Sequence, residues 1–319
     1  EGSIYVASNF GKTVSVIDTK TNTVGSPIVV GQFPVAMAFD SVHNRMYVVN
    51  SDDKVSVIDV KTNTVIKTIP LAHVGHDAAI AFDTAHKRMY VALEDDDSVG
   101  VIDTNTNTVV GSPIEVGSFP QGIAFDSVHN RMYVTSLFDD SVSVIDTNTN
   151  TVVGSPIPLP PEISDQAFGI TFDEKLSRMY VSTTRVDGKD WVVVIDTNTN
   201  AIFFAMQVEE GPISITFDSI HRRVYALNAF AVDSISVIST NDNTVIGSPI
   251  PVSFNSREIA FDPIHGRVYI TNGSDDTVSV YDTNTNTVVG LPLFVGEEPE
   301  AIAFAPPLTT TNVFGPSVP

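Results

Sequence analysis

The sequence contains no cysteine, and basic residues are scarce. Without cysteine there is neither a disulfide framework nor a zinc–thiolate site, and no cysteine nucleophile is available. Lys and Arg number 17 against 38 Asp and Glu, so the formal net charge is −21. Because binding to nucleic acid requires Lys and Arg to neutralise phosphates, we expect no nucleic-acid partner.

Long apolar runs and the usual catalytic motifs are also missing. No stretch approaches the roughly 20 apolar residues of a membrane-spanning helix, which predicts no membrane insertion. We find no Gly-x-Ser-x-Gly elbow, no His-Glu-x-x-His and no glycine-rich phosphate loop. These absences favour a protein without enzymatic activity and leave an enzyme as the alternative.

A repeat occupies most of the chain. The phrase Phe-Asp, a four-residue turn and Arg-(Met/Val)-Tyr recurs at intervals of 43 to 47 residues, a period typical of propellers and solenoids. Its phenylalanines are Phe39, Phe82, Phe125, Phe172, Phe217, Phe261 and Phe304.

Each period contains four short β-branched or alternating runs, which in the third copy are residues 121–125, 131–136, 141–145 and 151–157. Four antiparallel strands make one propeller blade. The sequence therefore predicts an all-β, seven-bladed β-propeller of four-stranded antiparallel blades.

The two ends of the chain share the seventh blade in this prediction. Phe304 is followed by Ala305 in place of Asp, and Ser3 stands where the Arg before Tyr5 would be. We expect residues 301–305 to pair with residues 4–9, so that the C-terminal strand closes the ring and removes exposed edges. Residues 1–306 then form a single propeller. The Thr/Pro-rich residues 307–319 are expected to be a tail or linker to other domains of a larger surface protein.

Several repeated polar residues are expected to serve the turns. Seven equivalent asparagines, Asn107 among them, are suited to a left-handed backbone, and the Asp–Arg pairs such as Asp40/Arg45 are expected to form cross-strand ion pairs. Five equivalent histidines, His43 among them, are interpreted as turn residues. The Asn272-Gly-Ser274 sequon lies in a loop that we expect to accept a glycan.

The repeat resembles a known family. Tyr133-Val-Thr-Ser, Tyr269-Ile-Thr-Asn and Tyr47-Val-Val-Asn, followed in the clearest copies by Ser-Asp-Asp-x-Val-Ser-Val and later Asn-Thr-Val, are similar to the YVTN β-propeller repeat. The resemblance covers residues 3–305. It implies a module like those of archaeal surface-layer proteins, with an extracellular or cell-surface location, and it also admits lactonases and streptogramin-type lyases.

Most of the negative charge is predicted to lie on one face. The loops after the second and fourth strands share a face, and they contain more than half of the 38 acidic residues. The expected partners are cations or basic protein surfaces. Runs such as residues 94–97 could supply carboxylates to surface calcium or another divalent cation, although no loop has the spacing of a dedicated calcium loop.

Two sets of candidate site residues fall on this face. His73, His76 and Asp77 have the residue types of a transition-metal site. Gln121, Phe168, Arg257 and Glu300 occupy equivalent positions at the start of the innermost strands. Arg257 and Glu300 could simply form an ion pair at the channel mouth. Alternatively, the four could line a small-molecule funnel, where His73, His76, Arg257 and Glu258 would supply the groups of a metal-assisted lyase or lactonase.

Overall fold

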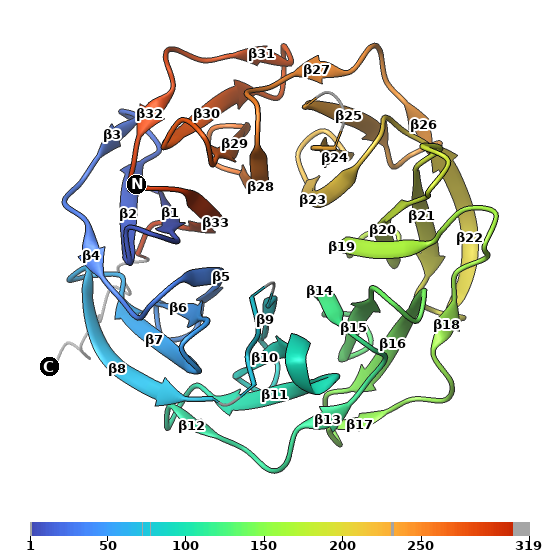
Figure 1. The fold of residues 1–319 in the computed structure, drawn as a ribbon, viewed down its shortest axis with the longest axis horizontal. Helices are drawn as coiled ribbons and strands as arrows, with labels where there is room; N and C mark the ends of the chain where they lie inside the picture. Colours follow the sequence, from blue (N-terminus) through green and yellow to red (C-terminus); the bar gives the residue numbers. More distant parts are fainter. Residues whose placement is uncertain (1, 72, 77, 231–232, 309–319) are drawn as a thin grey trace, which may run out of the picture.

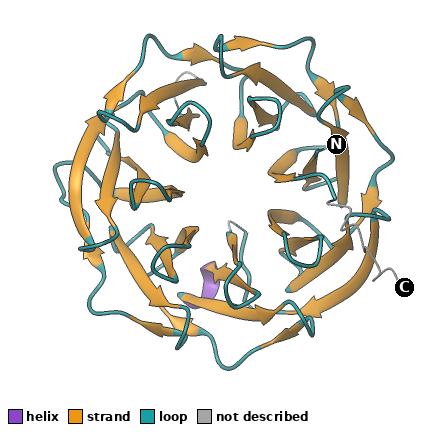
Figure 2. Cartoon of the chain, turned by 180° about the vertical axis from the view of Figure 1, so that it is seen from behind, coloured by secondary structure: helices purple, strands orange, loops and turns teal. Residues whose placement is uncertain are grey.

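The computed structural model describes residues 2–71, 73–76, 78–230 and 233–308. These residues form seven antiparallel sheets arranged as the blades of a closed ring (Figures 1 and 2), which confirms the predicted seven-bladed propeller. No helix in the described ranges is long and apolar enough to span a membrane.

Three blades follow one another from the N-terminal side. Blade 1 contains β5 (Pro34–Asp40), β6 (Arg45–Asn50), β7 (Lys54–Asp59) and β8 (Thr64–Pro70). Blade 2 contains β9 (Ile80–Asp83), β10 (Arg88–Leu93), the 3-10 helix η1 (Glu94–Asp96), β11 (Ser98–Asp103), β12 (Thr108–Val109) and β13 (Ile114–Glu115). Blade 3 contains β14 (Pro120–Asp126), β15 (Arg131–Ser136), β16 (Ser141–Asp146), β17 (Thr151–Val152) and β18 (Ile157–Pro158).

Four further blades complete the ring. Blade 4 contains β19 (Gln166–Asp173), β20 (Arg178–Thr184), β21 (Trp191–Asp196) and β22 (Ala201–Gln207). Blade 5 contains β23 (Pro212–Asp218), β24 (Arg223–Asn228), β25 (Ser234–Ser239), β26 (Thr244–Val245) and β27 (Ile250–Pro251). Blade 6 contains β28 (Ser256–Asp262), β29 (Arg267–Asn272), β30 (Thr277–Asp282), β31 (Thr287–Val288) and β32 (Leu293–Phe294). Blade 7 contains β33 (Pro299–Ala305), β1 (Ser3–Ser8), β2 (Thr13–Asp18), β3 (Thr23–Val24) and β4 (Ile28–Val29).

The expected closure of the ring is confirmed. β33 is the innermost strand of blade 7 and pairs with β1 in a register that runs from Ser3↔Ala305 to Ser8↔Pro299. The C-terminal strand thereby covers the free edge of the first strand.

The outermost strand differs from the prediction in five blades. There it is split into two short pieces that both pair with the third strand, as β17 and β18 do with β16. In blade 3, Gly154 has a φ of +66° and is followed by Ser155 and Pro156, which has no amide hydrogen to donate. The Gly-Ser-Pro sequence therefore interrupts the strand. Blades 2, 5 and 7 have the same sequence and blade 6 has Gly290-Leu-Pro, whereas blades 1 and 4 have no Gly-x-Pro sequence here and keep an unbroken outer strand.

Adjacent blades are held together by a buried tyrosine from each second strand. All seven tyrosines are at most 1% exposed, and each hydroxyl donates to the asparagine of the turn between the third and fourth strands of the next blade. The pairs are Tyr5–Asn63, Tyr47–Asn107, Tyr90–Asn150, Tyr133–Asn200, Tyr180–Asn243, Tyr225–Asn286 and Tyr269–Asn22. The seven asparagines have φ between 52° and 57°, which confirms the predicted left-handed turns. The same residue thus forms its turn and binds the neighbouring blade.

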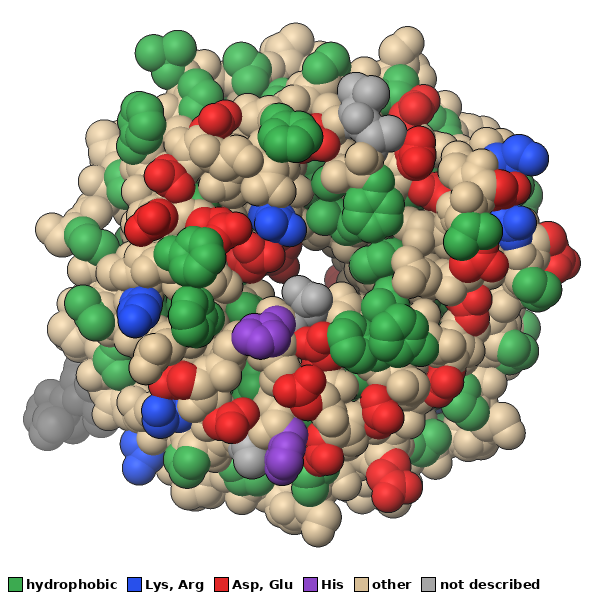
Figure 3. Space-filling view, viewed as in Figure 1, with side chains coloured by type: hydrophobic (Ala, Val, Ile, Leu, Met, Phe, Trp, Pro, Cys, Tyr) green, Lys and Arg blue, Asp and Glu red, His purple; other side chains and the backbone are tan. Residues whose placement is uncertain are grey.

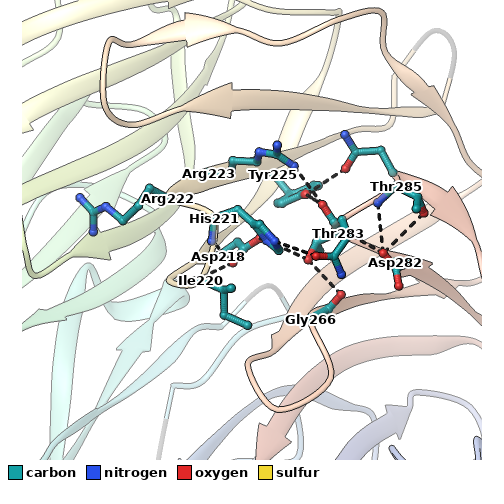
Figure 4. A network of polar contacts seen from close by, with 12 residues as sticks. Asp218, Ile220, His221, Arg222, Arg223, Tyr225, Gly266, Asp282, Thr283 and Thr285 are labelled. Carbon is teal, nitrogen blue, oxygen red and sulfur yellow. Dashed lines mark hydrogen bonds and ion pairs between the residues drawn. The ribbon is translucent and has the colours of Figure 1, made fainter.

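The predicted Asp–Arg ion pairs are not formed. Asp218 instead accepts backbone hydrogen bonds from its own turn and pairs with His221, whose Nδ1 lies 2.8 Å from its Oδ2 (Figure 4). Arg223 reaches the next blade, where Nη1 donates to the carbonyl oxygen of Thr283 at 2.9 Å. The aspartate carboxylate already accepts hydrogen bonds from the amides of its own turn, so it lies close to the histidine three residues along. The arginine extends to the next blade instead. The histidines are structural, as the sequence indicated.

The sequon prediction is wrong. Asn272 is 0% exposed, and its Nδ2 donates to Thr277 Oγ1 and Ser279 Oγ at 2.9 Å each. The amide nitrogen that would carry a glycan is therefore inside blade 6 and already bonded. A loop position in the repeat does not make this side chain accessible, because Asn272 is the last residue of β29.

Candidate functional site

A cavity lies at one end of the channel. Pro34 pairs with Asn50 in blade 1, so the loop before the first strand and the loop after the second meet at the same edge of the sheet. We call the face of the ring that carries these loops the upper face. The channel opens at its centre (Figure 3), and the opening widens into a cavity of about 400 Å³, here called the upper cavity. Its polar and aromatic lining residues are His76, Gln121, Phe168, Ser214, Phe230, Arg257, Glu258 and Glu300.

The upper cavity brings together all four residues of the predicted funnel. Gln121 is on β14, Phe168 on β19, Arg257 on β28 and Glu300 on β33. They meet because equivalent positions near the start of the innermost strands surround the channel axis. Their role in ligand binding stays a prediction.

Blades 6 and 7 provide the charged part of the wall. Arg257 Nη2 lies 3.7 Å from Glu298 Oε1, and its Nε lies 3.8 Å from Glu300 Oε2. The expected contact between Arg257 and Glu300 is therefore present, at a distance too long for a hydrogen bond. Arg257 Nε makes no hydrogen bond within the described structure, although it is buried. One guanidinium thus faces several carboxylates, and the local charge is negative.

Glu258 is the cavity residue with the most strongly perturbed side chain. Its Oε2 accepts a hydrogen bond of 2.6 Å from the backbone amide of Ile302 in blade 7. Protein surrounds the carboxyl group closely, although part of the side chain borders the cavity. Burial and, to a smaller extent, the nearby charge of Glu300 together raise the pKa of Glu258 to about 8, against the lowering effect of the Ile302 amide. Glu258 therefore exchanges a proton near neutral pH.

The opposite part of the wall is aromatic and polar. Phe168 from blade 4 and Phe230 from the loop after β24 pack edge to face, with ring centroids 6.0 Å apart. Gln121 from blade 3 has a buried Nε2 atom that donates no hydrogen bond within the described residues. The cavity thus combines an apolar wall with a few polar groups, as small-molecule sites do.

The predicted histidine site is only partly described. His73 and His76 are both exposed, but His76 alone of the two lines the upper cavity. The backbone amide of His76 donates to Glu94 Oε2 at 2.6 Å, which anchors its loop to η1. Asp77 lies outside the described residues, so the predicted metal site of His73, His76 and Asp77 remains a prediction. Among the residues that the structure places, no group of three or more His, Asp or Glu side chains could hold a metal ion.

Many upper-face carboxylates connect neighbouring blades. Asp97 Oδ1 accepts the amide of Phe119 at 2.8 Å, Asp190 Oδ2 that of Gly211 at 2.6 Å, and Asp276 Oδ1 that of Glu298 at 2.8 Å. Each bond joins the loop after the second strand of one blade to the loop before the first strand of the next. These aspartates therefore stabilise the contact between blades in addition to contributing charge. The sequence shows their charge but does not show this structural role.

Phe230 extends the predicted funnel, and Glu258, which the sequence suggested only as a catalytic group, is part of the same wall. Phe230 is in one of the irregular loops, but its position outside the repeat gave no indication of its contact with Phe168. Glu258 follows Arg257 directly in the sequence. Strand alternation would turn it away from the channel, yet the pairing of β28 with β29 shifts register between Ser256 and Ile259. The same register shift occurs in other blades, where successive residues such as Gln121 and Gly122 also line the cavity; in blade 6 both residues of the pair are charged.

No family model matches the sequence, and no match was found among curated proteins. Solved structures are similar in fold. A candidate 6-phosphogluconolactonase of Bacteroides fragilis has a TM-score of 0.78 at 14% identity and covers 96% of this chain and 98% of its own. Its counterpart from Bacteroides uniformis has a TM-score of 0.77 at 13% identity, over 95% of this chain and 99% of its own.

A third similar structure is the hydrazine synthase of Kuenenia stuttgartiensis. Its TM-score is 0.74 at 16% identity, and the alignment covers 84% of this chain and 88% of the other. Proteins with different names thus share this architecture, and identities at this level establish the fold alone. The comparisons identify the chain as a seven-bladed β-propeller.

Proposed function

We propose that this chain is a propeller module of an extracellular or cell-surface protein, similar to the modules of archaeal surface layers. In this proposal its upper face binds cations or basic partner proteins. The upper cavity is the part of that face that binds small molecules. The resemblance to the YVTN repeat and the net charge of −21 support it. The observation that carries it is the upper cavity, where Glu258 and Glu300 share the wall with two aromatic rings and Arg257 is the only guanidinium among the described lining residues.

An organic cation suits this cavity better than an anion. Carboxylates at the mouth attract positive charge, and the faces of Phe168 and Phe230 are compatible with an ammonium or guanidinium group. A phosphorylated substrate would bring negative charge toward Glu298 and Glu300, and above about pH 8 toward ionised Glu258 as well, with one arginine to offset it. Divalent cations such as calcium belong to the same proposal, because the exposed acidic loops provide oxygen ligands.

We expect spermidine and calcium chloride to raise Tm by roughly 2–3 °C beyond sodium chloride of the same ionic strength. Specific binding stabilises the folded state, whereas screening acts equally for matched salts. The measurement is differential scanning fluorimetry at pH 8.5, where Glu258 is mostly ionised. The double variant Glu258→Gln/Glu300→Gln should lose the additional stabilisation by spermidine.

The control is Asp95→Asn/Asp275→Asn, which removes the same formal charge from two exposed residues outside the cavity. It should retain the response to spermidine. Equal responses of wild-type protein to all three salts would contradict a specific cation site. A metal analysis of protein purified without chelator, with His73→Ala/His76→Ala as its control, tests the predicted metal site separately.

A lactonase or lyase is the second candidate, and Glu258 is the observation that favours it. A carboxyl group with a pKa of about 8 beside Arg257 could act as a general base once ionised, while the guanidinium stabilises developing negative charge on a substrate oxygen. Hydrolysis of neutral glucono-δ-lactone provides the assay. Turnover that Glu258→Gln abolishes would establish this alternative, and no turnover above the uncatalysed rate would reject it for this substrate.

A further inference from the structure

Exposed phenylalanines lie among the acidic residues of the upper face. Phe10 is 57% exposed and Phe138 is 64% exposed, in the loops after the second strands of blades 7 and 3. Figure 3 shows hydrophobic and acidic side chains interleaved around the channel opening on this face. Large exposed aromatic side chains of this kind are typical of interaction surfaces.

Each of these two phenylalanines packs against a second one. The Phe10 and Phe33 rings are edge to face with centroids 6.1 Å apart, and the Phe119 and Phe138 centroids are 4.8 Å apart. We call these two pairs the aromatic platforms. They stand on different blades, on two sides of the channel, so one extended ligand could contact both.

The half-buried member of each platform has an unfavourable backbone conformation. Phe33 has a φ of +50° and Phe119 a φ of +58°, a region that costs a non-glycine residue about 1–2 kcal/mol. At the equivalent position, blade 5 has Gly211 and blade 6 has Asn255, which tolerate this conformation. The platforms are therefore built on phenylalanine where the backbone would favour glycine or asparagine.

Acidic residues lie next to both platforms. Asp139 follows Phe138 and accepts the amide of Ser118, the residue before Phe119, at 2.7 Å. In the loop of Phe10, the amides of Gly11 and Asn9 donate to the backbone carbonyl oxygens of Glu297 and Glu298, so two acidic residues lie beside this loop. A ring with a nearby carboxylate suits a lysine or arginine, whose aliphatic stem packs on the ring while its head group meets the charge.

One such contact is already present within the chain. The Nζ atom of Lys12 lies 5.8 Å from the centroid of Phe33, within the range of a cation–π interaction. The platform formed by Phe10 and Phe33 therefore accommodates a cationic side chain.

We propose that the two aromatic platforms, with their neighbouring acidic residues, dock an extended lysine- or arginine-rich segment of a partner protein across the upper face. The negative charge of the face favours a basic segment. The phenylalanines add cation–π and packing contacts to the charge attraction. This inference rests on the proposed function, since it names the partner of the acidic face and the residues that hold it.

Fluorescence anisotropy with fluorescein-labelled octa-arginine tests the inference, and octaglutamate is the charge-reversed probe. We expect octa-arginine alone to bind, with an affinity that falls as sodium chloride is added. Phe10→Ala/Phe138→Ala should weaken binding about fivefold to tenfold, which is the loss expected for two exposed cation–π contacts. Phe10→Leu/Phe138→Leu should weaken it similarly, because leucine fills space without a ring.

The matched control is Phe204→Ala/Phe294→Ala, two exposed phenylalanines on the outer strands β22 and β32. Its Kd for octa-arginine should lie within about twofold of the wild-type Kd. Unchanged affinity in both Phe10/Phe138 variants would overturn the inference. If spermidine stabilisation still depends on Glu258 and Glu300 in that case, the proposed function stands. If wild-type protein binds no octa-arginine and gains nothing from spermidine or calcium, both fail.

Discussion

Deletion of residues 299–319 is expected to abolish cooperative folding. β33 supplies the innermost strand of blade 7 and buries Ala301, Ile302 and Ala305. Without it, β1 becomes an exposed edge strand, Glu258 loses the amide of Ile302, and the packing of β33 against β5 and β28 is lost. Circular dichroism should show no sharp thermal transition, and size-exclusion chromatography should show aggregates.

The control deletes residues 307–319 only and keeps β33 entire. Its melting temperature should match that of the full chain within about 1 °C, because this deletion removes none of the strands in the described structure. A 299–319 deletion that melts at the wild-type temperature would show that blade 7 does not depend on its C-terminal strand.

Glu258→Gln should make stability less dependent on pH between about 5 and 9. In the unfolded chain the carboxyl group has an ordinary pKa of 4.5, whereas in the folded protein burial raises it to about 8. Between these values the folded state binds more protons, so this group contributes stability that is complete below pH 4.5 and is lost as pH rises through 8. We expect that contribution to be about 1–3 kcal/mol, after allowing for the side of Glu258 that borders the cavity.

Urea denaturation at a series of pH values measures the effect. The variant keeps a carbonyl oxygen that can accept the Ile302 amide, so its stability should equal or exceed that of wild type at pH 9. Asp275→Asn serves as the control, since it removes an exposed carboxylate and should preserve the wild-type slope. Parallel pH profiles of Glu258→Gln and wild type would show that Glu258 is ionised throughout the range.

The sequence predicts the architecture because the same strand and turn pattern occurs seven times. The interval between Phe-Asp phrases determines the blade, and the changes at Ala305 and Ser3 locate the joint. The four residues of the funnel were found in the same way, since equivalent positions in a ring surround one axis. Their convergence follows from symmetry rather than from a motif.

Contacts between blades could not be predicted from the same pattern. Tyr90 and its partner Asn150 are 60 residues apart, and both look like ordinary strand and turn residues within their own repeat. Asp276 looks like a surface charge, yet it binds the amide of Glu298 in the next blade. A repeat shows which residues recur and leaves open whether their partners lie in the same copy or the next. Glu258 has such a contact with the backbone amide of Ile302 in the adjacent blade, and this hydrogen bond partly offsets the rise in pKa that burial causes.

The pairing of β33 with β1 also determines how the propeller responds to tension. Because Ser3 faces Ala305, the chain enters and leaves the ring at the same end of this strand pair. A force that separates the two ends acts first on the hydrogen bonds beside Ser3 and Ala305, and it acts along those bonds, since they lie across the strands. The strands would then peel apart one bond after another instead of shearing along their whole length. Mechanical load would open the ring at the joint that closes it.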